Sequence, residues 1–441
     1  MNTSNKHIWH ITYPILMTLL AQNVINVTDT AFLGRVGEVE LGASAIGGVF
    51  FIAIFMVCFG FSMGSQILIG RRNGEKNYLE IGKIFNNGIL FSFLLAVIIF
   101  IFSQSLISPI LGAIVKSENI YTASVEYLSW RSFGFFFLFA NVMFRALFVG
   151  ITQTKVLSVS ALITAVVNIF FDYVLIFGKF GLPAMGIKGA AIASVIAEGA
   201  TTIYLILYTL NKVNRQKYGL FSFRKIDFEI IKKTLDISVY IMFQYFISVS
   251  TWFLFFIFIE RTGERPLAVS NIVRSLYAIL IIPASALGTT TSTMISNLIG
   301  EDRSAEVLRF LKKVITINAV ISIPFVLFTL AFPELCINIY TTDVDLIAAT
   351  VPVVRVVSFS ILVFGTGLLL FNSVSATGNT RIAFIFELVV LFFYILYTYL
   401  TTIILNSPIE IVWIAEYVYW GLIAAVSFVY LKYGNWRKIK I

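Results

Sequence analysis

The chain has 441 residues, of which 59% are hydrophobic and only 12% charged, and its formal net charge is +9. A soluble globular chain carries roughly 25% charged residues, so this composition cannot supply a compact fold with a water-facing surface. It excludes a soluble enzyme, an extracellular module and a nucleic-acid-binding protein, and no nucleic-acid partner is expected. The length instead suits about twelve bilayer spans of ~20 residues with their connections. We predict an all-α polytopic membrane protein.

The apolar runs, taken in chain order, form two sets. The first set lies near residues 9–33, 42–70, 82–109, 120–149, 156–178 and 187–210, and the second near 232–260, 266–299, 309–331, 347–375, 382–405 and 409–432. The basic and polar connection between the sets predicts a cytoplasmic linker at 211–229, with six-helix lobes at 1–210 and 230–441. The first run follows no cleavage-type pattern and is interpreted as a retained span.

Lysine and arginine are unevenly distributed over the connections. With both termini and the linker on one side of the membrane, that side holds 23 of the 32 basic residues, including Arg224, Lys225 and Lys440. The other side holds 6, and 3 lie within spans. Because Lys and Arg resist translocation, the richer side is cytoplasmic. We predict cytoplasmic termini, an integral plasma-membrane protein of the bacterial inner membrane, and anionic inner-leaflet lipids as neighbours.

This orientation has a direct test. Cysteines introduced at Lys217, in the linker, and at Lys179, after the fifth run, should react with an impermeant thiol reagent from opposite sides of the membrane. Labelling of both positions from the same side would contradict the topology.

The sequence repeats itself at a shift of 226 residues. At this register an Arg-x-Gly-Glu motif, a Gly-Glu pair and a Thr followed by a basic residue all recur. The matched segments are 35–38 with 261–264, 74–75 with 300–301, and 154–155 with 380–381. Such clusters at one register indicate a duplication. Because each half holds an even number of runs, we predict two bundles related by a pseudo-twofold axis along the membrane normal, with a central cleft.

Groups for enzyme chemistry are scarce. The only histidines, His7 and His10, lie in the polar N-terminal segment, and the two cysteines form no CxxC or metal-type pattern. No glycine-rich phosphate loop is present, and the motif Gly60-x-x-x-Gly64 is typical of close helix packing. We predict that the chain is not an enzyme and has no cofactor.

Two aspartates lie inside apolar runs, where a charged group costs roughly 2.5–3.5 kcal/mol to insert. Asp29 shares a helical face with Gln22 and Asn26, and Asp172 follows Asn168 by one turn. Both acids fall in the same half of the membrane, and the amides could hydrogen-bond a protonated or ion-bound carboxyl. This pattern favours an ion or proton pathway. The alternative is a set of buried hydrogen bonds that only ties helices together.

The second half of the chain lacks these acids. At the 226-residue shift the positions of Asp29, Asn168 and Asp172 are taken by Phe255, Tyr394 and Thr398. A duplicated scaffold that needed the acids for packing would have reason to keep both copies, whereas a coupling site needs only one. The asymmetry therefore supports the pathway interpretation.

Other charges within or near spans are less informative. Glu198 and Glu387 are either hydrogen-bonded structural acids or part of a water-filled path. Arg131 either snorkels to the surface or contacts substrate. Glu260, at a run's end, is interpreted as a solvated boundary charge. We add Asn26, Glu198 and Arg131 to the predicted pathway.

Several motifs occur together in a recognisable order. They are Pro14…Gln22…Asp29-Thr30…Gly34…Gly37, Gly70–Glu75, Tyr127…Arg131, and Asn168-x-x-x-Asp172 followed by Gly178 and Gly186–Ala191. Together they resemble the multidrug and toxic compound extrusion (MATE) transporters, and the resemblance covers the whole chain.

The resemblance implies a role for each matched residue. The acids Asp29 and Asp172 match the family's cation- or proton-binding pair, and the surrounding network matches at Gln22, Tyr127 and Asn168. Pro14 matches a first-helix proline associated with bending, as expected where a helical hydrogen bond is lost. Acids confined to the first half resemble the DinF-like branch. The seventh run lacks the glutamate often seen in sodium-coupled relatives. Its absence favours protons as the coupling ion, and sodium bound at Asp29 and Asp172 is the alternative.

Three functions from different classes remain in view. The first is a secondary antiporter that exports amphipathic, often cationic, organic compounds in exchange for protons or sodium by alternating access, acting as a monomer among membrane lipids. The second is a flippase for lipid-linked oligosaccharides, which would need a more basic cleft and extra spans. The third is a membrane-embedded enzyme, for which no catalytic constellation is found.

Overall fold

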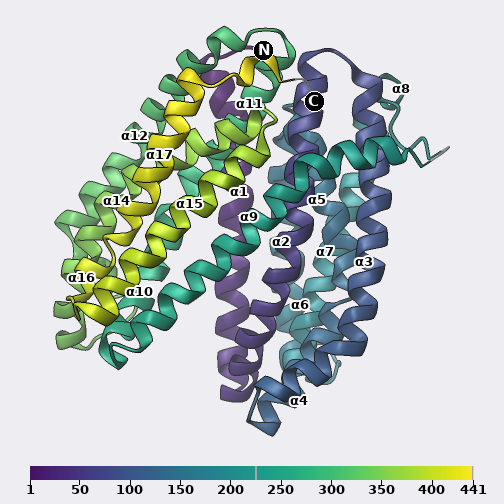
Figure 1. Ribbon diagram of the computed structural model, residues 1–441. Coiled ribbons are helices and arrows are strands. Elements are labelled where there is room, and N and C mark those ends of the chain that lie inside the picture. The colour runs from purple at the N-terminus through teal and green to yellow at the C-terminus, as the bar shows by residue number, and fades with distance from the viewer. Residues whose placement is uncertain (224–225, 440) are drawn as a thin grey trace. The chain divides into compact units, whose positions relative to one another are not determined.

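The structure, a computed structural model, describes residues 1–223, 226–439 and 441. Three basic residues used in the topology prediction, Arg224, Lys225 and Lys440, lie outside the described residues. Within the described ranges all regular structure is helical (Figure 1).

The helices follow one another through short connections. Those of the first half are α1 (Asn5–Val36), α2 (Glu38–Gly74), α3 (Tyr78–Ile114), α4 (Glu118–Arg131), α5 (Gly134–Gly150), α6 (Lys155–Phe177), α7 (Gly186–Lys212) and α8 (Arg215–Tyr218). The later ones are α9 (Phe228–Glu260), α10 (Glu264–Leu280), α11 (Ile282–Gly300), α12 (Val307–Ala331), α13 (Pro333–Ile337), α14 (Val344–Ala376), α15 (Thr380–Tyr399), α16 (Ile409–Val412) and α17 (Ala415–Tyr433). A π-helical turn, Leu400–Ile404, continues α15.

Ten of the described helices are long and apolar enough to cross a membrane, and two bent pairs raise the number to twelve. The predicted all-helical architecture with about twelve spans is therefore confirmed. The bent pairs, α4 with α5 at 52° and α10 with α11 at 45°, were not expected from the apolar runs. Pro283 in the first turn of α11 cannot donate the hydrogen bond that would continue α10. Ser132 and Gly134 flank the other break, a pairing typical of kinks.

Compact packing divides the chain into two units, and both divisions fall inside helices, α1 and α9. One unit comprises Trp9–Met242, and the other comprises Met1–Ile8 together with Phe243–Ile441. Helix α9 runs through this division, whereas the sequence placed the lobe boundary in the linker at 211–229. The predicted pseudo-twofold axis and central cleft stay predictions.

The first turns of α9 belong to the first unit because they pack against the glycines of α2. A Cβ on Gly60 would lie 2.7 Å from the Met242 Cα, and one on Gly64 would lie 2.9 Å from the Ser238 Cα. Ser238 also donates a hydrogen bond to the Phe61 carbonyl at 3.2 Å. The GxxxG motif thus acts as a packing surface, as the sequence indicated.

Helices α6 and α7, which carry most of the candidate site, approach each other at a glycine. A side chain on Gly189 would place its Cβ 2.7 Å from the Leu175 carbonyl carbon and 2.9 Å from the Ile176 nitrogen. Backbone atoms cannot move aside as a flexible side-chain end can. The register between α6 and α7 therefore depends on this position.

We expect Gly189→Ala to lower the thermal unfolding midpoint, because overpacking of a filled contact costs about 1–3 kcal/mol. Gly48→Ala is the matched control, since Gly48 lies within α2 and a Cβ there meets nothing within 4 Å. It should leave stability unchanged or raise it by about 0.5–1 kcal/mol. Detergent-solubilised protein followed by intrinsic fluorescence measures both, and equal midpoints for the two variants would refute the packing argument.

Candidate functional site

The two aspartates predicted from the sequence come together within the unit Trp9–Met242. Asp29 of α1 is half-buried and Asp172 of α6 is fully buried. Their carboxyl groups are close enough to interact directly. Among the described residues, no donor reaches either oxygen of Asp172 or the buried Oδ1 of Asp29. Two ionised carboxylates cannot hydrogen-bond each other, so the two groups can share a hydrogen bond only when one of them carries a proton.

An apolar cluster covers the pair at one end. Leu33 and Ile176 lie one helical turn beyond Asp29 and Asp172, and both are buried. They pack with Ala43, Ile187 and Ala190 from α2 and α7. The cluster excludes water at the end where α1 and α6 terminate.

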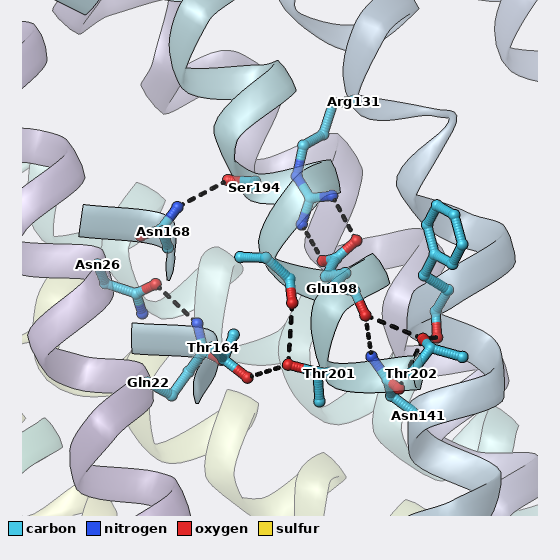
Figure 2. A network of polar contacts seen from close by, with 12 residues as sticks. Gln22, Asn26, Arg131, Asn141, Thr164, Asn168, Ser194, Glu198, Thr201 and Thr202 are labelled. Carbon is cyan, nitrogen blue, oxygen red and sulfur yellow. Dashed lines mark hydrogen bonds and ion pairs between the residues drawn. The ribbon is translucent and has the colours of Figure 1, made fainter. Parts of the chain in front are cut away.

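A buried ion pair lies beside the aspartates. Arg131, at the end of α4, donates from Nη1 to Glu198 Oε2 at 2.9 Å and from Nη2 to Oε1 at 2.5 Å (Figure 2). The two residues are only 7% and 8% exposed. Arg131 therefore does not snorkel to the surface, because its charge is matched by a carboxylate inside the unit. Substrate contact by Arg131 stays a prediction. Glu198, for which a water-filled path was one interpretation, is an ion-pair partner.

The break between α4 and α5 positions this guanidinium. Arg131 occupies the last turn of α4, where the negative end of the helix dipole favours a cation. Gly134 opens α5, and a Cβ there would collide with both Arg131 and Glu198. The guanidinium carbon lies 3.9 Å from the centre of the Phe51 ring, a cation–π distance. A straight helix or a larger residue would leave no room for the pair.

Polar side chains of α5, α6 and α7 extend the network in Figure 2. Asn141 donates to the Glu198 carbonyl at 3.1 Å, and Thr202 bonds both that carbonyl and Asn141. Asn168 donates to Ser194 at 3.5 Å, not to Asp172. The sequence placed Asn168 correctly beside the acid but not its hydrogen bond.

The remaining predicted residues lie around the pair. Tyr127 is beside Arg131 and interacts electrostatically with Asp29. Gln22 and Asn26 are exposed and hydrogen-bond each other at 3.2 Å. Their amides thus pair with each other, and the expected bond to Asp29 is not seen among the described contacts.

Pro14 lies within α1, which continues through it as one helix. Proline has no N–H, so the carbonyl of His10 loses its helical donor. The hydroxyl of Thr154, just before α6, reaches the carbonyls of His10 at 3.4 Å and Ile11 at 3.1 Å. Sequence patterning gave no sign of this tertiary compensation.

Metal ligands are not clustered in the part of the chain that the structure describes. No group of three or more His, Cys, Asp or Glu side chains there is arranged to hold a metal ion. The oxygen pair of Asp29 and Asp172 suits a proton or a hard monovalent cation.

The long apolar helices define an integral membrane protein, and two of them bring a pair of carboxyl groups together in its interior. The MatE family model matches residues 14–174 and again residues 241–400. The chain therefore belongs to the MatE family, which confirms the resemblance and places it among transporters, not enzymes. Two matches starting at 14 and 241 also agree with a duplication near 226 residues.

Relatives and solved structures agree with this assignment. The chain is 23% identical over 384 residues to the "Probable multidrug resistance protein YoeA" of Bacillus subtilis, covering 85% of this chain and 83% of that protein. It superposes with a TM-score of 0.89 on the "Outward-facing conformation of a multidrug resistance MATE family transporter", at 17% identity, covering 99% and 97% of the two chains. The eukaryotic MATE transporter AtDTX14 gives a TM-score of 0.86 at 19% identity, covering 98% and 96%. These structures share the fold of this chain.

The ion pair generates a stability prediction. We expect Arg131→Met or Glu198→Met to destabilise the folded protein by about 3–5 kcal/mol, because each leaves the partner's charge buried and unpaired. The double variant Arg131→Met, Glu198→Met should recover most of that loss. A double-mutant cycle of unfolding midpoints measures the coupling, and additive losses would show that the pair contributes nothing as a pair.

Proposed function

We propose that the protein is a secondary active antiporter that exports amphipathic, often cationic, organic compounds in exchange for protons by alternating access. The observation that carries the proposal is the Asp29–Asp172 pair: Asp172 is fully buried, and neither of its oxygens nor Oδ1 of Asp29 meets a hydrogen-bond donor among the described residues. Membership of the MatE family and relatives named as multidrug resistance proteins support the substrate class.

The coupling step follows from charge. The positive charge of Arg131 acts on both aspartates, but it is shared with Glu198, its direct ion-pair partner. We infer that the aspartates hold a proton between them when no other cation is bound. Loss of that proton leaves two negative charges facing each other, which drives them apart or recruits a cationic substrate. One charge moving down about 100 mV supplies ~2.3 kcal/mol, enough for a roughly 50-fold gradient.

The apolar cluster would control access to the pair. In the predicted topology the ends of α1 and α6 face outside, and Leu33 and Ile176 stand between the carboxyls and that side. Separation of these two helices would open the pair to external protons. Pro14 supplies a place in α1 where the backbone can bend as they separate.

Alternatives are distinguished by the same residues. Sodium suits two carboxylates as well, so the coupling ion is tested directly: a proton ionophore should collapse dye efflux, whereas removal of sodium should not.

The flippase for lipid-linked oligosaccharides is not favoured, because the relatives carry multidrug resistance names and Arg131 is neutralised.

The remaining features belong to the same proposal. We place the protein in the bacterial inner membrane as a monomer of the DinF-like branch with both termini cytoplasmic, in contact with lipids and small amphipathic substrates. It needs no cofactor beyond the coupling ion.

Asp29→Asn and Asp172→Asn should each abolish efflux of a fluorescent cationic dye from whole cells, because an amide cannot take up and release a proton. Glu260→Gln is the matched control; this exposed acid ends α9 and should leave efflux near the wild-type rate. Membrane levels of each variant, measured by fluorescence-detected size exclusion, separate lost coupling from lost protein. Near wild-type efflux by both aspartate variants would end the coupling assignment.

A further inference from the structure

The unit containing Phe243–Ile441 holds two buried acids of its own, Glu387 on α15 and Glu416 on α17. They are 1% and 4% exposed. At the 226-residue shift their positions correspond to Ala161 and Ala190, so neither is a copy of the aspartates in the first half. In the described part of the chain neither forms an ion pair, and each must be neutralised or solvated in some other way.

Glu416 is fully engaged by donors. Its Oε2 accepts from the hydroxyl of Tyr277 at 2.9 Å, and its Oε1 from Tyr394 at 3.4 Å. Both carboxylate oxygens of Glu416 accept hydrogen bonds, as expected for a carboxylate with a structural role.

Glu387 is engaged on one side only. Tyr419 donates to its Oε1 at 2.6 Å, and the Ser248 hydroxyl reaches the same oxygen. The other oxygen, Oε2, is buried without a partner among the described residues. An ionised carboxylate with one bare oxygen costs far more free energy in an apolar interior than the protonated, neutral form does.

Ser248 can serve Glu387 in two ways. Its hydroxyl also lies 2.8 Å from the carbonyl oxygen of Gln244, but it has a single hydrogen. When the carboxyl is ionised, Ser248 donates to Glu387 and leaves the Gln244 carbonyl. When the carboxyl carries a proton on Oε1, it donates to the Ser248 oxygen, and Ser248 donates to Gln244. Every hydrogen is accounted for in both arrangements.

We propose that Glu387 is a second proton-binding site, located in the unit of Phe243–Ile441, with Ser248 and Tyr419 as its hydroxyl partners. These residues come from α15, α9 and α17, so gain or loss of the proton changes a contact among three helices. From α9 the facing group is Ser248, and from α17 it is Tyr419 with Glu416 behind it. Helix α14 also packs on α15, and within the described residues none of its titratable groups acts on Glu387.

The role in transport rests on the proposed antiport, but proton binding at Glu387 does not. Infrared spectroscopy of the full-length protein in lipid vesicles separates the two, because a protonated carboxylic acid and a carboxylate absorb at different frequencies. The measurement uses the Asp29→Asn, Asp172→Asn background, which removes the first pair. We expect a protonated-acid band that disappears as pH is raised and is absent after Glu387→Gln.

Matched variants complete the spectroscopic test. Tyr419→Phe removes one hydrogen bond to Oε1 and should shift the frequency and the midpoint of the band without abolishing it. Glu334→Gln, at an exposed acid in α13, should leave the band unchanged. If Glu387→Gln does not fold, the shift in Tyr419→Phe and Ser248→Ala decides the assignment. A band unaffected by these three changes, or one displaced by sodium but not by pH, would overturn the proposal.

Transport gives an independent result in the otherwise unaltered protein. Glu387→Gln should lower the number of protons exchanged per exported dye molecule by one, measured in vesicles with a pH-sensitive probe. An unchanged ratio would remove Glu387 from the coupling reaction. Absence of any proton–dye exchange in the wild type would instead refute the proposed antiport, while the infrared titration still decides whether Glu387 binds a proton.

Discussion

The cost of keeping charge in hydrocarbon governs how this chain arranges its few buried ionisable side chains. Arg131 and Glu198 satisfy each other through two parallel hydrogen bonds. Glu416 is served by hydroxyl donors on both oxygens. Asp172 and Glu387 each have at least one carboxyl oxygen without a hydrogen-bond donor among the described residues, and this separates them from the paired charges. Both proposals for ion binding rest on this difference, since a missing partner separates these acids from the paired ones more clearly than burial does.

The spans could be predicted from the sequence because each is a long apolar run with Gly, Pro, Asn or charge at its ends. The two breaks could not, since the apolar pattern continues through Ser132–Gly134 and through Pro283. Pro283 is visible in the sequence as a possible helix break, but the apolar run continues on both sides of it and predicts one uninterrupted span. The division inside α9 was also hidden, because it depends on glycines of α2 that are distant in sequence.

The site was predicted in part for a related reason. Inserted acids are conspicuous in apolar runs, so Asp29 and Asp172 could be found by composition alone. The partner of Arg131 depends on the rotation of α4 against α7, which no single-sequence pattern contains. Asn168 and Asp172 share a helix face, yet the amide of Asn168 bonds the Ser194 hydroxyl, which α7 supplies. Local spacing fixes which residues are neighbours along a helix, and packing between helices fixes which of them bond.

Thr154 provides a pivot point, or fulcrum, at which α1 could tilt relative to α6. Its hydroxyl attaches the start of α6 to the carbonyls of His10 and Ile11, whereas Asp29 meets the same helix α6 near the opposite end. Eighteen residues from Ile11 to Asp29 make a lever of about 27 Å at ~1.5 Å per residue. A tilt of about 10° around that fulcrum would displace Asp29 by about 5 Å. The polar contacts of α1 with α6 near this point are hydrogen bonds from Thr154 and Thr18, with no covalent or ionic link among them. If the helices separate as proposed, a small rotation of α1 there would become a large separation of the two carboxyls.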